Sequence, residues 1–269
     1  MSRIHPTAIV DPSAEIDQDV EVGPYVIIKG HVVIGAGTVV DSHCVIHGHT
    51  VIGSACRIGP CAFVGLAPQH RSNAGIGTSC YIGDGAVIRE TAQVHRSTRP
   101  GEEFATRIGA RCYMMAASHV GHDCRIGDDV TLANAVLLGG HVVVGNNVFF
   151  GGASGVHQHC RVGRLAIIAG IEQVTRDIPP FAAVRYGGLK GYNAIGCKRS
   201  GFDAESIHAI RDAYRCLHSH RTLPDAIAAM RETVAALPVR DEIIAFATAK
   251  GRGLPPSVHF TRASAALSD

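Results

Sequence analysis

The stretch Val120–Gly145, "VGHDCRIGDDVTLANAVLLGGHVVVG", places an aliphatic side chain at every sixth position and usually follows it with glycine. A unit of six residues is too short for a helix pair or a propeller blade, but it suits one short strand and one corner. Three units close a triangular coil of 18 residues. The aliphatic side chains then point inward and stack on the next coil at about 4.8 Å. The stretch therefore predicts an all-β solenoid.

The same six-residue register covers most of the chain. It is unbroken over residues 4–64 and 108–174, with a shorter piece over 82–94. Glycine often follows the aliphatic position, and we expect these glycines at corners that need a positive φ or have no room for a Cβ. They are Gly23, Gly35, Gly53, Gly59, Gly65, Gly83, Gly109, Gly121, Gly127, Gly139, Gly145 and Gly163.

Two segments interrupt the register, "LAPQHRSNAGIGTS" at 66–79 and "HRSTRPGEEFATR" at 95–107. Both are polar and rich in glycine or proline, which predicts loops that leave the solenoid wall. Long loops on a rigid scaffold often cover a site or contact a neighbour, although floppy insertions are the alternative.

Beyond Val174 the register ends and a helical pattern begins. Asp203 is placed to cap a helix whose apolar residues recur at helical spacing, and shorter helices are predicted near 223–236 and 240–249. The predicted domains are a β-helix over 1–190 and a C-terminal helical domain over 191–269.

Composition excludes several classes of function. A formal net charge of +2 and the lack of a basic and aromatic stripe argue against nucleic-acid binding. The nine cysteines occur singly, which favours reduced core fillers and a cytoplasmic protein over a disulfide or zinc framework. The first residues have no apolar core of a signal peptide, and no apolar run is long enough for a membrane span.

Histidines gather on one predicted edge. Asp123, His141 and His159 are 18 residues apart, so they occupy the same corner of three successive coils, with His122 beside the first. A solvated polar wall, a metal site and acid–base catalysis all fit such a cluster. If His122 is a base, Asp123 can orient it only where the corner bends the two side chains together. Because a solenoid wall is convex, we expect the site in a cleft between copies of a homotrimer.

Several segments together carry a family resemblance: "SHVGHDC", "LLGGHVVVG" one coil later, "GVHQHCRVG" on the next, then "IPPF" and "KRSGF". With the two loops, they resemble the acyl-carrier-protein-dependent UDP-N-acetylglucosamine O-acyltransferases of lipid A biosynthesis over nearly the full chain. The resemblance implies a left-handed parallel β-helix, a homotrimer, and transfer of a 3-hydroxyacyl chain from acyl carrier protein to the 3-hydroxyl of UDP-N-acetylglucosamine. The acyl chain arrives on the phosphopantetheine of acyl carrier protein, so no further cofactor and no metal are implied.

The resemblance also implies roles for residues. His122 matches the general base, Asp123 the carboxylate that supports it, and Gly140 the backbone N–H donor for the oxyanion. Gly170 matches the position that sets acyl length, where glycine leaves room for a longer chain. Other matches imply substrate binding by His119, His141, His157, Gln158, Asn193, Lys198 and Arg199.

The chain departs from the family on the acceptor side. A sugar-contacting aspartate and a lysine are replaced by His70 and Ser72, and a glutamate and an arginine by Ile195 and Ser200. Arg71 is a candidate to replace the lost lysine. These losses leave two alternatives, an enzyme for another nucleotide sugar or hydroxylated acceptor, and a non-catalytic scaffold that binds acyl carrier protein.

A zinc enzyme of the carbonic anhydrase type shares the solenoid, but its ligand spacing differs from the three-residue spacing of His119 and His122. For acidic acyl carrier protein we predict a basic docking patch. It consists of Lys198, Arg199, Arg211, Arg215 and Arg221.

Overall fold

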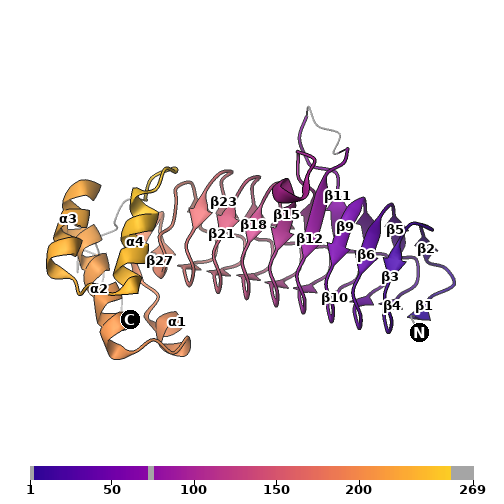
Figure 1. Ribbon diagram of the computed structural model, residues 1–269, viewed down its shortest axis with the longest axis horizontal. Coiled ribbons are helices and arrows are strands. Elements are labelled where there is room, and N and C mark those ends of the chain that lie inside the picture. Colours follow the sequence, from indigo (N-terminus) through magenta and orange to yellow (C-terminus); the bar gives the residue numbers. More distant parts are fainter. Residues whose placement is uncertain (1–2, 72–75, 256–269) are drawn as a thin grey trace, which may run out of the picture.

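The computed structural model describes residues 3–71 and 76–255, and the chain winds there as a parallel β-solenoid with helices at one end (Figure 1). Three sheets form the walls of the prism. The predicted fold class is confirmed.

The first sheet has 11 strands. Ten run parallel, and β28 closes the sheet antiparallel to β27. The strands are β1 (Arg3–Ile4), β4 (Glu21–Val22), β7 (Val39–Val40), β10 (Arg57–Ile58), β13 (Val87–Ile88), β16 (Tyr113–Met114), β19 (Thr131–Leu132), β22 (Phe149–Phe150), β25 (Ile167–Ile168), β27 (Ala182–Arg185) and β28 (Gly188–Tyr192).

The second and third sheets have 9 and 8 strands. The second contains β2 (Ile9–Val10), β5 (Ile27–Lys29), β8 (Val45–His47), β11 (Phe63–Leu66), β14 (Gln93–His95), β17 (His119–Val120), β20 (Leu137–Leu138), β23 (Gly155–Val156) and β26 (Gln173–Val174). The third contains β3 (Glu15–Ile16), β6 (Val32–Ile34), β9 (His49–Ile52), β12 (Ser79–Ile82), β15 (Thr106–Ile108), β18 (Arg125–Ile126), β21 (Val143–Val144) and β24 (Arg161–Val162).

Strand pairing gives the length of each coil. Arg125 pairs with Val143, one predicted coil of 18 residues later. Where the first loop intervenes Phe63 pairs with Gln93, and where the second intervenes Gln93 pairs with His119. Both loops leave the wall between the second and third sheets, as Figure 1 shows beside β11, β12 and β15. They are slightly shorter than predicted, because the flanking strands extend to Leu66, Ser79, His95 and Thr106.

The core of the prism is the predicted aliphatic column. From Val22 to Val174 its members are at most 6% exposed, whereas Ile4 in the terminal coil is 43% exposed. A second column, two residues earlier in each unit, is made of small residues such as Val130, Ala62 and Cys124. All nine cysteines are free, and all but Cys61 are buried, as expected for small core fillers.

Of the two causes that the sequence suggested for the corner glycines, lack of room for a Cβ accounts for most of them. Most of them have an ordinary φ, and the positive φ falls two residues later on non-glycine residues such as Asp123. A Cβ at Gly121 would lie 2.9 Å from Gly140 N in the next coil, closer than real Cβ atoms approach. Glycine is therefore required by the close approach of successive coils, and the positive-φ reason holds only at exceptions such as Gly65 (φ 74°).

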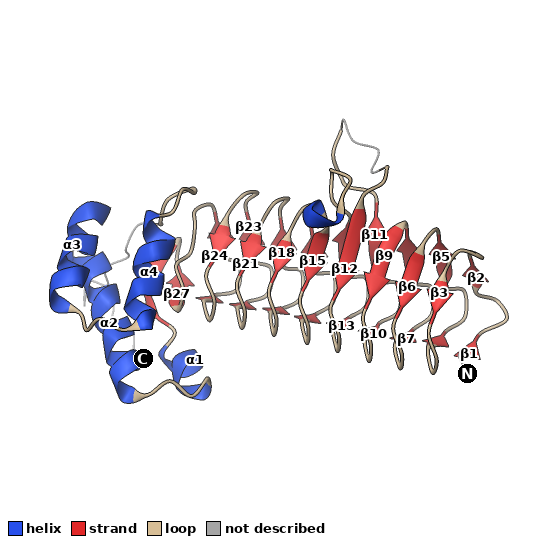
Figure 2. Ribbon diagram, viewed as in Figure 1, coloured by secondary structure: helices blue, strands red, loops and turns tan. Residues whose placement is uncertain are grey.

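Helices cover the C-terminal end of the prism (Figure 2). Asp203 caps α2 by accepting a hydrogen bond from Ser206 N at 2.7 Å, as the sequence predicted. An ion pair between Arg164 and Glu242 ties α4 to the last coil, and Arg161 donates a hydrogen bond to the carbonyl of Phe246 in the same helix. The helices are α1 (Ala194–Arg199), α2 (Ala204–Ser219), α3 (Leu223–Thr233) and α4 (Pro238–Thr248), with a 3₁₀ turn, η1 (Glu102–Phe104), in the second loop.

Candidate active site

The predicted corner column exists. Asp123, His141 and His159 all have a left-handed backbone, with φ of 60°, 60° and 64°. The rings of His141 and His159 stack with centroids 4.5 Å apart, and His141 Nε2 lies 3.5 Å from Asp123 Oδ2. One coil of 18 residues therefore places each of these three side chains directly above the one before it.

The corner also bends Asp123 toward its neighbour. His122 Nδ1 lies 2.7 Å from Asp123 Oδ2, and the two side chains are 12% and 7% exposed. Adjacent residues in a flat strand would face opposite ways. The left-handed φ of Asp123 removes that obstacle, so the aspartate can orient the imidazole.

The second loop holds this aspartate in place. Asp123 accepts hydrogen bonds from Thr98 N at 3.0 Å and from the Thr98 hydroxyl at 2.8 Å. Its own N–H donates to the Thr106 hydroxyl at 2.8 Å. Burial raises the pKa of Asp123, but the hydrogen bonds from Thr98 and His122 outweigh it and leave that pKa below its usual value. Thr98 and Thr106 were missed from the sequence, because no periodicity places a loop residue.

Gly140 lies under the ring of His122. A Cβ there would come 2.5 Å from Cε1 and 2.7 Å from Nε2 of His122. Ala110 occupies the position in its six-residue unit that Gly140 occupies in its own, but at another edge of the prism. The N–H of Ala110 donates to Asp128 Oδ1 at 2.8 Å. The N–H of Gly140, in contrast, has no acceptor among the described residues. It is thus a backbone donor beside the imidazole.

A second histidine pair lies below the column on the second sheet. The rings of His119 and His95 are 5.1 Å apart, and His95 Nδ1 lies 2.8 Å from Ala67 O. Burial, together with the nearby His95, lowers the pKa of His119 to about 4. Burial likewise lowers the pKa of His95. Both rings are therefore neutral near pH 7.

A groove of about 630 Å³ runs over the outer face of the second sheet, and His119, Leu137 and His157 line it together with Gln69 of the first loop. Gln158 is an exposed corner residue of the same edge. The predicted ligand residues His119 and His157 thus share one surface.

His70 reaches the proposed base. Its ring meets that of His122 edge to face, with centroids 5.7 Å apart. Arg71 is exposed, and Ser72 lies outside the described residues. The first loop therefore adds an imidazole to the catalytic edge, a contact that sequence spacing did not indicate.

The remaining predicted residues lie elsewhere on the same chain. Gly170 is at the corner between the first and second sheets, beside an apolar groove of about 370 Å³ lined by Phe149, Ile167 and Lys190. Asn193 caps α1: its Oδ1 accepts from Gly196 N at 2.9 Å and its Nδ2 donates to Leu165 O at 2.9 Å.

The exposed Lys198 and Arg199 follow at the end of α1. A single chain does not gather Asn193, Lys198 or Arg199 around His122.

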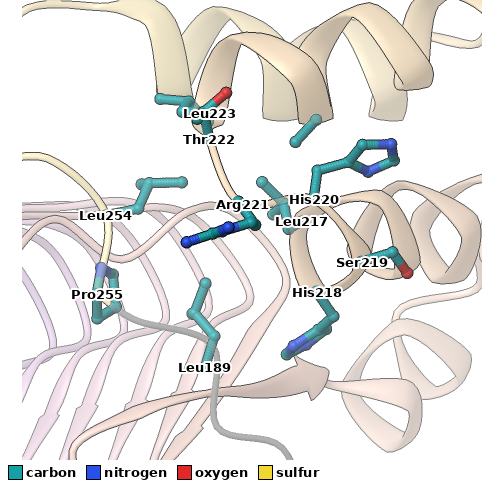
Figure 3. Close-up of a pocket in the computed structure, with 11 residues that line it drawn as sticks. Leu189, Leu217, His218, Ser219, His220, Arg221, Thr222, Leu223, Leu254 and Pro255 are labelled. Carbon is teal, nitrogen blue, oxygen red and sulfur yellow. The ribbon is translucent and has the colours of Figure 1, made fainter.

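The predicted basic patch is divided. Arg211 and Arg215 both bond Asp212 Oδ1, at 3.0 and 3.1 Å, which offsets part of their charge. Helix α2 has 16 residues and is therefore about 24 Å long. Arg221 follows its C-terminal end, whereas Lys198 and Arg199 precede its N-terminal end. Figure 3 shows Arg221 in a pocket of about 710 Å³ beside Leu217 and Leu254.

Two family models match the sequence. One, described as UDP N-acetylglucosamine O-acyltransferase, Domain 2, matches residues 177–255, and the bacterial transferase hexapeptide model matches 31–66. An acyl-[acyl-carrier-protein]–UDP-N-acetylglucosamine O-acyltransferase of Alkalilimnicola ehrlichii is 43% identical over 94% of this chain and 99% of its own. One from Anaeromyxobacter sp. (strain Fw109-5) is 50% identical over 84% of this chain and 88% of its own. The chain belongs to the acyl-[acyl-carrier-protein]–UDP-N-acetylglucosamine O-acyltransferase family.

Solved structures of UDP-N-acetylglucosamine acyltransferases have the same fold. The Francisella novicida enzyme superposes with a TM-score of 0.89 at 32% identity and 99% coverage of both chains. LpxA from Acinetobacter baumannii superposes with a TM-score of 0.87 at 36% identity, covering 93% of this chain and 98% of that one. The predicted family and the enzyme class of acyltransferase are thereby confirmed.

No helix among the described residues of this acyltransferase is both long enough and apolar enough to cross a membrane. Ile195 is 66% exposed on α1. Ser200 is the exposed C-cap residue of the same helix. Ile195 and Ser200, two of the positions at which the chain departs from the family on the acceptor side, are thus exposed to solvent at α1.

Proposed function

We propose that this protein transfers a 3-hydroxyacyl chain from acyl carrier protein to the 3-hydroxyl of UDP-N-acetylglucosamine, the first step of lipid A biosynthesis. The observation that carries the proposal is the contact of His122 with both Asp123 and Gly140. The names of the relatives support the two substrates.

His122 is the general base in this proposal. The ionised Asp123 can only accept a hydrogen bond, so His122 carries its hydrogen on Nδ1 and its lone pair on Nε2. Nε2 takes the proton as the acceptor hydroxyl oxygen attacks the thioester carbonyl. The C–S bond then breaks, and the proton is returned to the departing thiolate of phosphopantetheine. Such a base typically contributes about 10² to 10⁴ in rate.

The Gly140 N–H stabilises the oxyanion that forms on the carbonyl oxygen. It is adjacent to the His122 ring and has no competing acceptor among the described residues. A single donor of this kind is worth about 3 kcal/mol. The acyl chain is delivered on acyl carrier protein, so the step needs no other cofactor.

A homotrimer completes the site. Gly170, Lys198 and Arg199 lie away from the His122 edge of their own chain, and a neighbouring prism can bring its copies of them to that edge. Exposed apolar side chains on the flanking walls support such packing: Leu137 is 55%, Phe149 41% and Ile171 84% exposed. Free, buried cysteines support a cytoplasmic location.

His70 of the first loop bears on the identity of the acceptor. His70 in place of the family's aspartate puts an imidazole against His122, where the acceptor sugar would bind. This contact favours a second candidate, acylation of a related nucleotide sugar. Binding of acyl carrier protein without catalysis is the non-enzymatic outcome.

Mass spectrometry of products distinguishes these functions. Purified protein is offered several 3-hydroxyacyl carrier proteins with a panel of nucleotide sugars, and His122→Ala is the control. O-acylated UDP-N-acetylglucosamine that disappears in the control supports the proposal. A product from a different sugar selects the second candidate, whereas binding of acyl carrier protein with no product contradicts both enzymatic functions.

A further inference from the structure

Two imidazoles and a carboxylate of the catalytic edge have the arrangement of a transition-metal site. One ligand atom each from His122, Asp123 and His141 lie within 4.8 Å of one another. His122 Nδ1 is 2.7 Å and His141 Nε2 3.5 Å from Asp123 Oδ2. Tetrahedral zinc with bonds of about 2.0–2.2 Å separates its ligand atoms by roughly 3.4 Å, so small side-chain movements suffice.

We propose that these three residues form an inhibitory site for a divalent transition metal such as Zn²⁺. Imidazole nitrogen and carboxylate oxygen suit zinc, whereas Mg²⁺ and Ca²⁺ prefer sites built from oxygen alone. His141, whose side chain is 33% exposed, opens the site to solvent, and a water completes the tetrahedron.

The metal takes the place of the hydrogen that His122 Nδ1 shares with Asp123 Oδ2. Thr98 still donates to Asp123, so the carboxylate remains fixed while it binds the ion. With Nδ1 coordinated, the neutral ring carries its single hydrogen on Nε2. Nε2 then has no lone pair with which to accept the proton of the acceptor hydroxyl, and the base is disabled.

The surroundings both support and oppose the ion. The ring of His159 stacks on His141 and fixes its plane. The carboxylate of Asp123 attracts a cation to the site, whereas the positive charge of Arg99 near His141 repels it. We therefore expect a reversible site.

Binding is tested with untagged full-length protein by isothermal titration with Zn²⁺ and by the visible spectrum of Co²⁺. Asn is the appropriate replacement, because it tolerates the left-handed φ of 60° at both Asp123 and His141. Asp123→Asn and His141→Asn should each raise the Kd at least tenfold. His43→Asn is the matched control, since His43 has the same φ on a different edge and should keep the wild-type Kd.

Inhibition is tested in the same samples, and this part rests on the proposed role of His122. Zn²⁺ should abolish acyl transfer with an IC50 close to its Kd, a chelator should restore it, and Mg²⁺ should have no effect. The proposal is overturned if the Asn variants bind Zn²⁺ as the wild type does, or if saturation of the site leaves activity intact. The binding measurements need no turnover, so failure of the proposed function would be seen separately.

Discussion

The backbone N–H and the hydroxyl of Thr98 donate to the two carboxylate oxygens of Asp123, at 3.0 and 2.8 Å. A loop that interrupts the repeat thus fixes a corner of the repeat. Because Asp123 in turn bonds His122 Nδ1 at 2.7 Å, the loop sets the orientation of the proposed base.

Thr98→Val removes the hydroxyl and keeps the side-chain shape. A hydrogen bond to a charged group is worth about 1.5–3 kcal/mol, so we expect kcat to fall at least about tenfold as His122 loses its fixed orientation. Steady-state kinetics checks this, with Thr98→Ser as the control that keeps the hydroxyl. Equal rates for the Val and Ser variants would show that the hydroxyl does not position Asp123.

Gly140→Ala tests the contact between the ring and the backbone donor. The added Cβ would lie 2.5 Å from His122 Cε1, so the ring must move away from the reacting atoms. We expect kcat to fall by about 10² or more, with the melting temperature nearly unchanged, because the φ of Gly140 is ordinary.

Gly152→Ala is its matched control. Gly152 occupies the equivalent corner position on another edge, and the nearest atom to its Cβ would be Asn134 O at 3.4 Å. This variant should keep wild-type activity. A similar loss in both variants would point to a general effect of corner alanines and contradict the specific role of Gly140.

The repeat explains which parts of the site were predictable. A period of six fixes the coil, and the coil fixes the column of Asp123, His141 and His159 without any knowledge of side-chain contacts. The contacts of Thr98 with Asp123 and of His70 with His122 depend on the path of a loop, which has no period. The sequence left two reasons open for the corner glycines, because close approach between coils and a positive φ both select glycine, and the structure shows that close approach accounts for most of them.

His119 makes stability depend on pH. Its pKa is about 4 in the folded protein against an ordinary value of 6.5, so between these pH values the unfolded chain binds the extra proton. The stabilising contribution is therefore present above pH 6.5 and is lost as pH falls toward 4. After a discount for partial exposure, the loss is on the order of 2 kcal/mol.

Thermal unfolding of the wild type and of His119→Gln at several pH values measures this contribution. The difference in melting temperature between the two proteins should shift in favour of the variant as the pH is lowered from 7.5 to 5. A constant difference over that range would show that His119 titrates normally in the folded protein.

Asp212 weakens the predicted docking surface for acyl carrier protein, since it bonds both Arg211 and Arg215. Asp212→Asn should lower the apparent KM for acyl carrier protein about threefold, and the double change Arg211→Glu with Arg215→Glu should raise it several-fold. Both effects should shrink as salt is added.

Arg231 is an exposed arginine on α3, and Arg231→Glu is the control for a general charge effect. An unchanged KM in the double variant would remove this face of α2 from the docking surface.

Asp177 joins the solenoid to the helical end. It is fully buried and accepts bonds from Arg161 Nε at 2.9 Å and from Arg252 N at 2.9 Å. Asp177→Asn would leave the Arg161 guanidinium, whose side chain is 25% exposed, without its counter-charge. Loss of one partner from a fully buried pair typically costs about 3–5 kcal/mol, and we expect a smaller loss here because solvent reaches Arg161. Because Arg161 also donates to the carbonyl of Phe246 in α4, we expect the helices to unfold at a lower temperature than the solenoid in calorimetry.

Asp129→Asn is the control. It breaks an exposed pair with Arg111 and should cost at most about 1 kcal/mol. A single unchanged transition in Asp177→Asn would contradict this role of the buried pair.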